Sequence, residues 1–195
     1  MENKTLVVCT ANAGKLEELR LLLPKHLVLR TLEEAGITED VPETGETLEA
    51  NALQKARYVH ERTGLACVAD DTGLEVDALD GAPGVFSARY AGPQRNAADN
   101  MKKMLAELDG TSDRRARFRT VIAYIDSDGS EHQFEGEVQG TITHELRGIG
   151  GFGYDPIFLP HMSDLTFAEL PIEKKNAISH RAQAVWRFAR FISES

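Results

Sequence analysis

Short apolar runs alternate with segments of helical periodicity through the first half of this chain, and this alternation limits the possible fold more than any other feature. Pro24 and Gly64 stand where the first two helical segments should end. The predicted elements are strands at 6–10, 27–32 and 66–69 and helices at 16–23, 47–62 and 96–108. This order predicts an α/β protein, with helices on the faces of a mixed sheet.

The second half of the chain begins with a hairpin pattern. Alternating apolar residues at 118–125 and 133–142 are joined by Asp126-Ser127-Asp128-Gly129, a turn that requires a positive φ. A last helix is predicted from Ile178 to Ile192. With 195 residues and 42% apolar content the chain can build one sizeable core, so we expect a single domain spanning 1–195.

The composition excludes several classes of protein. A net charge of −9 argues against binding of a nucleic-acid polymer, which requires a basic face. There is no window of about 18 apolar residues for a membrane span. Because no signal-peptide cleavage site follows Met1, a cytoplasmic location is expected. Cys9 and Cys67 are then expected to be buried thiols and not a disulfide.

Two adjacent carboxylates, Asp70 and Asp71, follow a short apolar run and are the best catalytic candidates. Such a pair can hold a hard cation and activate water. In a continuing strand the two side chains would face opposite ways, so we expect a turn at Thr72-Gly73 to bring both toward one cation. Paired aspartates that only form a turn are the alternative. Further ligand oxygens could come from Glu43, Glu46 and Glu49.

A polar loop follows the first predicted strand. Its sequence is Thr10-Ala11-Asn12-Ala13-Gly14-Lys15. It is not a P-loop, because the leading glycine is missing and Leu16 stands where a hydroxyl would hold magnesium. It nevertheless gathers a hydroxyl, an amide, backbone N–H groups and an ammonium at a helix N-terminus, which suits a phosphate chain. A plain helix N-cap followed by a surface lysine is the alternative.

Three glycines surround an aromatic residue in Gly150-Gly151-Phe152-Gly153-Tyr154-Asp155-Pro156. With Gly148 they satisfy the dinucleotide-binding pattern, but Asp155-Pro156 stands where the phosphate-binding helix should begin. We interpret the segment as a turn whose aromatic ring stacks on a base, and a structural bend is the alternative. Farther on, His180 and Arg181 place an imidazole beside a guanidinium at the start of the last helix, where a solvated helix start is the alternative.

A cluster of arginines lies at the entrance of the first hairpin strand, at positions Arg114, Arg115, Arg117 and Arg119. Aromatic residues for base stacking are nearly absent among them. We therefore expect a solvated edge strand that resists aggregation, and not a nucleic-acid surface.

Taken in order, these segments closely resemble the inosine triphosphate pyrophosphatase family over nearly the whole chain. The motifs that carry the resemblance are Thr10-x-Asn12-x-x-Lys15, Glu43-Thr44-Gly45, Ala69-Asp70-Asp71-Thr72-Gly73-Leu74, Gly81-Ala82-Pro83-Gly84-Val85-x-Ser87-Ala88-Arg89, Gly150 to Pro156 and Ser179-His180-Arg181. The resemblance implies hydrolysis of inosine, deoxyinosine and xanthosine triphosphates (ITP, dITP and XTP) to the monophosphate and pyrophosphate, with Mg²⁺ as cofactor. It also implies an elongated fold of two lobes with a nucleotide cleft between them, and a homodimer.

The same resemblance implies roles for individual residues. Asp71 would be the general base, and Glu43 with Asp70 or Asp71 would bind the metal. The triphosphate would be held by Thr10, Ala11, Asn12, Ala13, Gly14 and Lys15. Contacts with the rest of the substrate would come from Thr72, Phe152, Gly153, Tyr154, Asp155, Lys175, His180 and Arg181.

Two other functions stay open on the residues alone. A different metal-dependent phosphohydrolase would release inorganic phosphate in place of pyrophosphate. A non-catalytic nucleotide-binding module would bind ITP without turnover.

Overall fold

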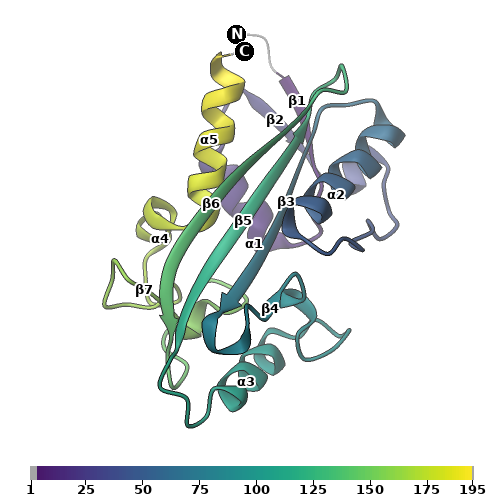
Figure 1. Cartoon of the computed structure of the whole chain (residues 1–195). Coiled ribbons are helices and arrows are strands. Elements are labelled where there is room, and N and C mark those ends of the chain that lie inside the picture. The colour runs from purple at the N-terminus through teal and green to yellow at the C-terminus, as the bar shows by residue number, and fades with distance from the viewer. Residues whose placement is uncertain (1–3, 195) are drawn as a thin grey trace. The chain divides into compact units, whose positions relative to one another are not determined.

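The computed structural model describes residues 4–194 and confirms the mixed α/β class (Figure 1). The seven-stranded sheet has the order β2-β1-β3-β5-β6-β7, and β4 pairs with β3. The strands are β1 (Lys4–Val8), β2 (Leu27–Arg30), β3 (Cys67–Val76), β4 (Pro83–Gly84), β5 (Arg115–Ile125), β6 (Glu131–Ile142) and β7 (Phe158–Pro160). The helices are α1 (Ala13–Leu22), α2 (Leu48–Thr63), α3 (Ala97–Glu107), α4 (Ile172–Ile178) and α5 (His180–Glu194).

Polar caps explain where the first three helices begin. The side chains of Asn12, Thr47 and Asn96 each accept a hydrogen bond from the backbone N–H three residues later. Gly64 ends α2 in the left-handed conformation at φ 64°, as predicted. Among the helices in residues 4–194, none is long and apolar enough to cross a bilayer.

The predicted start of the last helix is wrong. Ile178 belongs to α4, and Ser179 interrupts the helical path with an extended backbone at ψ 154°. A new helix, α5, then starts at His180. Apolar periodicity runs through both helices, so the sequence pattern alone does not reveal the break.

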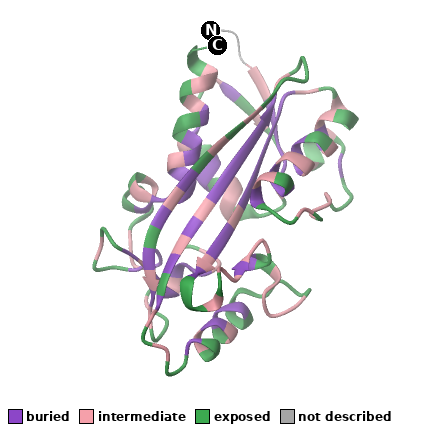
Figure 2. Cartoon of the chain, in the orientation of Figure 1, coloured by how far each residue is buried: buried purple, intermediate pink, exposed green. Residues whose placement is uncertain are grey.

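The described chain divides into two compact units. The first contains the residues up to Asp71, 120–136 and those from Arg181 onward, and the second contains 72–119 and 137–180. The division into two compact units does not test the expectation of a single domain over 1–195, which stays a prediction. Figure 2 shows that long stretches of β3 and β5 are buried.

The core of the first unit lies where β1, β3 and β5 pack against α1 and α5. Its buried residues include Leu6, Leu19, Val68, Tyr124 and Phe188. Strand β1 is parallel to both of its neighbours, β2 and β3. As predicted, both cysteines are buried free thiols.

The second unit has its own core, which gathers aromatic rings. Phe118 of β5 contacts Phe158 of β7 edge-on, with ring centroids 4.6 Å apart. Leu74 of β3 and Met104 of α3 belong to the same cluster, as does Phe167. The glycine-rich segment between β6 and β7 is part of this unit.

The edge-strand interpretation of the arginine cluster is wrong, because β5 lies between β3 and β6. Arg114 is buried, and its guanidinium donates only to backbone carbonyls, among them Ile142 O at 2.7 Å. Arg117 and Arg119 pair instead with Glu75 of the neighbouring strand. The charges of Arg117 and Arg119 are therefore neutralised within the sheet by a partner that is distant in sequence, whereas the exposed Arg115 pairs with Asp113.

Candidate functional site

Asp70 and Asp71 lie within β3, which continues without a turn to Val76. The expected turn at Thr72-Gly73 is absent there, because Leu74 and the residues after it are needed in the core and pair with β4. Successive side chains of a strand point to opposite faces. The expectation that both carboxylates turn toward one cation is therefore wrong.

The two aspartates stand just past the last residues that β1 and β3 pair. That pairing runs from Val7 with Cys67 to Val8 with Val68, after which the chain leaves β1 for the polar loop. From β1 the sheet extends to β2 on one side and to β3 on the other. The carboxyl ends of parallel strands at such a switch point are where α/β sheets usually bind ligands.

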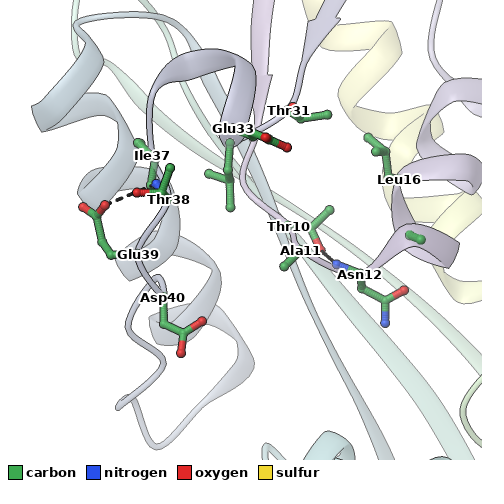
Figure 3. A pocket seen from close by; sticks show the side chains of 12 residues that line it. Thr10, Ala11, Asn12, Leu16, Thr31, Glu33, Ile37, Thr38, Glu39 and Asp40 are labelled. Atoms are coloured by element: carbon green, nitrogen blue, oxygen red, sulfur yellow. Dashed lines mark hydrogen bonds between the residues drawn. The ribbon is translucent and has the colours of Figure 1, made fainter.

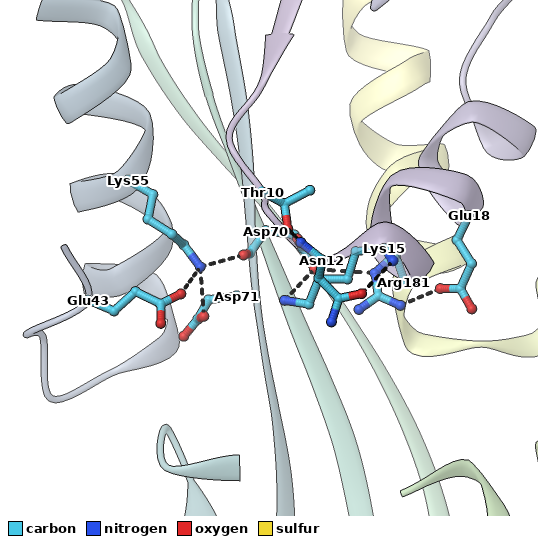
Figure 4. A network of polar contacts seen from close by, with 9 residues as sticks. All are labelled: Thr10, Asn12, Lys15, Glu18, Glu43, Lys55, Asp70, Asp71 and Arg181. Atoms are coloured by element: carbon cyan, nitrogen blue, oxygen red, sulfur yellow. Dashed lines mark hydrogen bonds and ion pairs between the residues drawn. The ribbon is translucent and has the colours of Figure 1, made fainter. Parts of the chain in front are cut away.

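Asp70 is the centre of a buried ion network (Figure 4). Its Oδ2 lies 3.1 Å from Lys15 Nζ and 3.2 Å from Arg181 Nε. Arg181 also pairs with the buried carboxylate of Glu18. Burial opposes the charge of Asp70, but the charges of Lys15 and Arg181 outweigh it and hold the pKa of Asp70 below its usual value. Asp70 is thus a fixed counter-ion for two cations.

Asp71 contacts a different cation, Lys55 of α2. The ammonium of Lys55 lies 2.9 Å from Asp71 Oδ1 and 2.7 Å from Glu43 Oε1. It also donates to the backbone carbonyl of Asp70 at 2.7 Å. Burial raises the pKa of Asp71, and the charge of Lys55 offsets only part of this effect. Asp71 is therefore the more basic carboxylate of the pair and the better proton acceptor.

The predicted metal ligands are brought together only in part. Glu43 and Asp71 converge on one cation, while the Asp70 carboxylate is engaged by Lys15 and Arg181. Within residues 4–194, no three His, Cys, Asp or Glu side chains are grouped so as to hold a metal ion. Mg²⁺ commonly uses only one or two carboxylates and takes its other ligands from substrate phosphates and water. The Glu43 and Asp71 pair fits that mode of binding.

The polar loop 10–15 caps α1 and faces a pocket. Asn12 Oδ1 accepts from the backbone N–H of Lys15 at 3.1 Å, and Thr10 Oγ1 accepts from that of Asn12 at 3.1 Å. The N-cap alternative is correct for Asn12, but Lys15 is not a surface lysine, since its ammonium contacts Asp70. The pocket has a volume of about 530 Å³ (Figure 3). Its lining is Thr10 to Ala13 and Leu16 on one side and Thr31 to Glu33 and Ile37 to Asp40 on the other.

In the second unit, the glycine-rich segment folds around Asp155. Its Oδ2 accepts from the backbone N–H of Phe152 at 2.8 Å and from Lys175 Nζ at 2.7 Å. The same ammonium lies 4.8 Å from the centroid of the Phe152 ring. Gly151 has φ 68°, and a Cβ there would overlap the Asp155 carboxylate. Glycine is required at 151 both for this backbone conformation and for this close approach.

His180 and Arg181 are adjacent in sequence but contact different partners. The imidazole of His180 stacks on Phe118, with ring centroids 4.6 Å apart, and also lies near Phe167. Arg181 makes the ion pairs with Asp70 and Glu18. Both side chains are buried, which excludes the alternative of a solvated helix start.

Two residues of these networks, Lys55 and Glu18, were not among the sequence candidates. Lys55 did leave a signal, because it falls with Leu48, Ala52 and Val59 on the apolar stripe of α2. A lysine in that position must find buried partners. No such sequence pattern marks Glu18, whose partner Arg181 is 163 residues away.

Comparisons with known proteins agree over nearly the full length. Residues 6–191 match the model of the Ham1 family. The chain is 54% identical over 188 residues to a Porphyromonas gingivalis protein named dITP/XTP pyrophosphatase, with 96% of each chain covered. A protein of the same name from Flavobacterium johnsoniae is 50% identical over 180 residues, covering 92% of this chain and 93% of the relative. The solved structure of a HAM1 protein from Coxiella burnetii superposes with a TM-score of 0.90 at 40% identity, covering 98% of this chain and all of that one (100%).

Proposed function

The chain belongs to the Ham1 family, and from this premise we propose that it hydrolyses the non-standard purine nucleoside triphosphates dITP, ITP and XTP to the monophosphate and pyrophosphate. One observation of the structure carries this proposal beyond the comparisons. It is the buried carboxylate Asp71, which has a raised pKa and stands with Glu43 around Lys55 in β3, just past the residues of that strand that pair with β1. A proton acceptor at a site rich in cations suits attack on a phosphoric anhydride.

In the proposed reaction Asp71 accepts a proton from water. The water oxygen attacks the α-phosphorus, the bond from that phosphorus to the α–β bridging oxygen breaks, and pyrophosphate leaves. A carboxylate whose pKa lies above the ordinary value is a stronger general base than an exposed aspartate. Asp70 cannot serve as well, because its pKa is lowered and its charge neutralises Lys15 and Arg181.

We propose that the triphosphate binds to loop 10–15. The loop supplies backbone N–H groups at the N-terminus of α1, and Lys15 and Lys55 supply positive charge. Glu43 and Asp71 would hold Mg²⁺ together with phosphate oxygens, and when bound the ion neutralises charge on the phosphates. Such neutralisation matters in a protein of net charge −9.

The base and sugar are proposed to bind in the second unit, at Phe152 to Asp155, Lys175 and His180, with Thr72 as a further substrate contact. Phe152 offers a ring face for stacking, and Lys175 offers only hydrogen-bond donors. Hypoxanthine and xanthine present an acceptor oxygen at position 6, where adenine presents a donor amine. A lysine at this position would therefore favour the 6-keto purines.

A product assay tests the proposal. With Mg²⁺ present, dITP, ITP and XTP should each yield pyrophosphate, and ATP should react with a kcat/KM lower by roughly 100-fold or more. Release of inorganic phosphate would indicate the other phosphohydrolase, and binding of dITP without turnover would indicate a non-catalytic module. Either result contradicts the proposal.

We also propose that the protein is a homodimer, as the family resemblance implies, and that it acts in the cytoplasm. Light scattering coupled to size exclusion measures the mass of the assembly. A particle of about twice the 21.5 kDa chain mass is expected.

A further inference from the structure

The segment around Ser87 belongs to a motif to which the proposed reaction gives no role, yet several side-chain hydrogen bonds hold it within the second unit. Ser87 is only 7% exposed. Its hydroxyl accepts from the backbone N–H of Leu74 at 2.9 Å and donates to Gly84 O at 2.6 Å. Through these two bonds the segment is attached to β3 and β4.

The carbonyl of Ser87 is a junction between two further elements. It accepts from Tyr154 Oη at 2.8 Å and from Asn100 Nδ2 of α3 at 3.3 Å. Tyr154 is 5% exposed, and burial raises the pKa of its hydroxyl, so the group keeps the proton that it donates. One carbonyl thus joins α3 to the residue directly before Asp155.

Asn100 uses its whole side chain to hold this segment. It is 4% exposed, and besides Ser87 O its amide donates to Ala88 O at 3.0 Å. Its Oδ1 accepts from the backbone N–H of Ala91 at 2.7 Å. All three partners are backbone groups, so Asn100 fixes the path of residues 87–91 and therefore the direction of the Ser87 carbonyl.

Tyr154 lies in the segment proposed to bind the base, between Gly153 and Asp155. Glycines at 150, 151 and 153 leave this backbone with wide conformational freedom, two of them at positive φ. Asp155 secures one end of the segment through Phe152 and Lys175. The Tyr154 hydroxyl provides a second attachment, to a group that the segment does not itself contain.

We propose that Asn100 is a positioning residue for substrate binding, which acts through the Ser87 carbonyl and the Tyr154 hydroxyl on segment 150–155. This inference rests on the proposed function, since it takes that segment to surround the base. The Asp71 carboxylate is hydrogen-bonded to Lys55 and not to this junction, so loss of the junction should change binding of the nucleotide and leave the chemical step nearly unaffected.

The test compares Tyr154→Phe, Asn100→Ala and the double variant. Tyr154→Phe keeps the ring and removes only the hydroxyl, so it should fold normally. Each single variant should raise KM for dITP by about 3- to 10-fold, the range expected for one net hydrogen bond, with kcat within about twofold of the wild type. The double variant should raise KM by less than the product of the two single effects, because both act through one carbonyl.

Asn96→Ala is the matched control. Asn96 caps the same helix through the backbone N–H of Asp99 but is exposed and has no contact with Ser87. It should lower the melting temperature and leave KM unchanged. An equal rise in KM for Asn96→Ala would show that helix stability causes the effect and would overturn the proposal.

Amide hydrogen exchange supplies a readout that does not need activity. The amides of 150–155 should exchange faster in Tyr154→Phe and Asn100→Ala than in the wild type and the Asn96→Ala control. Unchanged exchange or unchanged KM in Tyr154→Phe contradicts the positioning role. If the wild type fails to hydrolyse dITP, the proposed function fails, and the exchange result still decides whether the junction orders the segment.

Discussion

Asp70 and Asp71 are neighbours in one strand, yet their carboxylates have different partners. Asp70 is enclosed by Lys15 and Arg181, and Asp71 by Lys55 beside Glu43. Burial raises the pKa of Asp71 against the effect of Lys55, whereas at Asp70 the charges of Lys15 and Arg181 outweigh burial and lower the pKa. At the scale of single residues, this contrast separates a structural counter-ion from a proton acceptor.

Asp70→Asn should destabilise the fold. The substitution leaves the buried charges of Lys15 and Arg181 without their shared carboxylate, and breaking a buried pair typically costs roughly 3–5 kcal/mol. Urea denaturation of the variant measures the loss. Asp113→Asn, which removes an exposed partner of Arg115, should change stability little. Equal stability of the Asp70→Asn variant and the wild type would contradict the counter-ion role.

Lys15→Ala should act mainly on nucleotide binding. Its ammonium would meet phosphate oxygens that are charged in both ground and transition states, so KM should rise more than kcat falls. The dependence of KM on ionic strength should also weaken. Lys102→Ala, a change at an exposed lysine of α3, is the control. An unchanged KM for dITP in Lys15→Ala would rule out phosphate binding by this lysine.

Sequence reasoning reached the residue types of the site but not their ion pairs. Asp71, Lys15 and Arg181 were identified from their motifs. The contact of Arg181 with Asp70 spans 111 positions, and no local pattern records it. The substrate contact that the resemblance implies for Arg181 competes with its two ion pairs, and equal losses on dITP and ATP in Arg181→Ala would favour a structural role over a contact with the base.

At the scale of elements, the glycine-rich segment depends on one close approach. Gly151→Ala should strain the backbone and displace the Asp155 carboxylate from Phe152 and Lys175. We expect a higher KM for dITP together with a lower melting temperature. Gly110 has a similar φ of 71° but open space around it, so Gly110→Ala should lower the melting temperature alone. A normal KM in Gly151→Ala would contradict the account of this segment.

Most helices and strands could be predicted from periodicity and capping residues. The failures occurred where a distant partner overrides local composition. The sequence Asp70-Asp71-Thr72-Gly73 is typical of a turn, but it is held in a strand because Leu74 bonds to Ser87 and pairs with β4. The arginines of β5 were expected at a solvated edge, but β5 lies inside the sheet, where Arg117 pairs with carboxylates on both neighbouring strands.

At the scale of the whole molecule, an acidic chain buries several of its cations. Net charge is −9, yet Lys55, Lys175 and Arg181 are each less than 5% exposed. Each of these cations is paired with a buried carboxylate, which offsets its charge. The family and the class of reaction could be predicted, because the six motifs that carry the resemblance occur in order along the chain. The carboxylate partner of each cation could not be predicted, because it depends on tertiary contacts.

Removal of magnesium tests whether the proposed reaction requires this cofactor. A chelator should abolish pyrophosphate release from dITP, and added Mg²⁺ should restore it, because two carboxylates and a triphosphate repel each other without a divalent cation. Calorimetry in the presence of the chelator should show that the protein folds as it does with Mg²⁺. Full activity in the chelator would exclude a magnesium requirement.

In the proposed reaction Asp71 is the general base for pyrophosphate release. Steady-state release of pyrophosphate from dITP by Asp71→Asn tests this role, with circular dichroism to confirm folding. The variant should lose kcat by about 10²- to 10⁴-fold, the range for a positioned base, while nucleotide affinity is retained. A kcat near that of the wild type for Asp71→Asn, alongside a folded but inactive Asp70→Asn, would contradict the account and reverse the roles of the two aspartates.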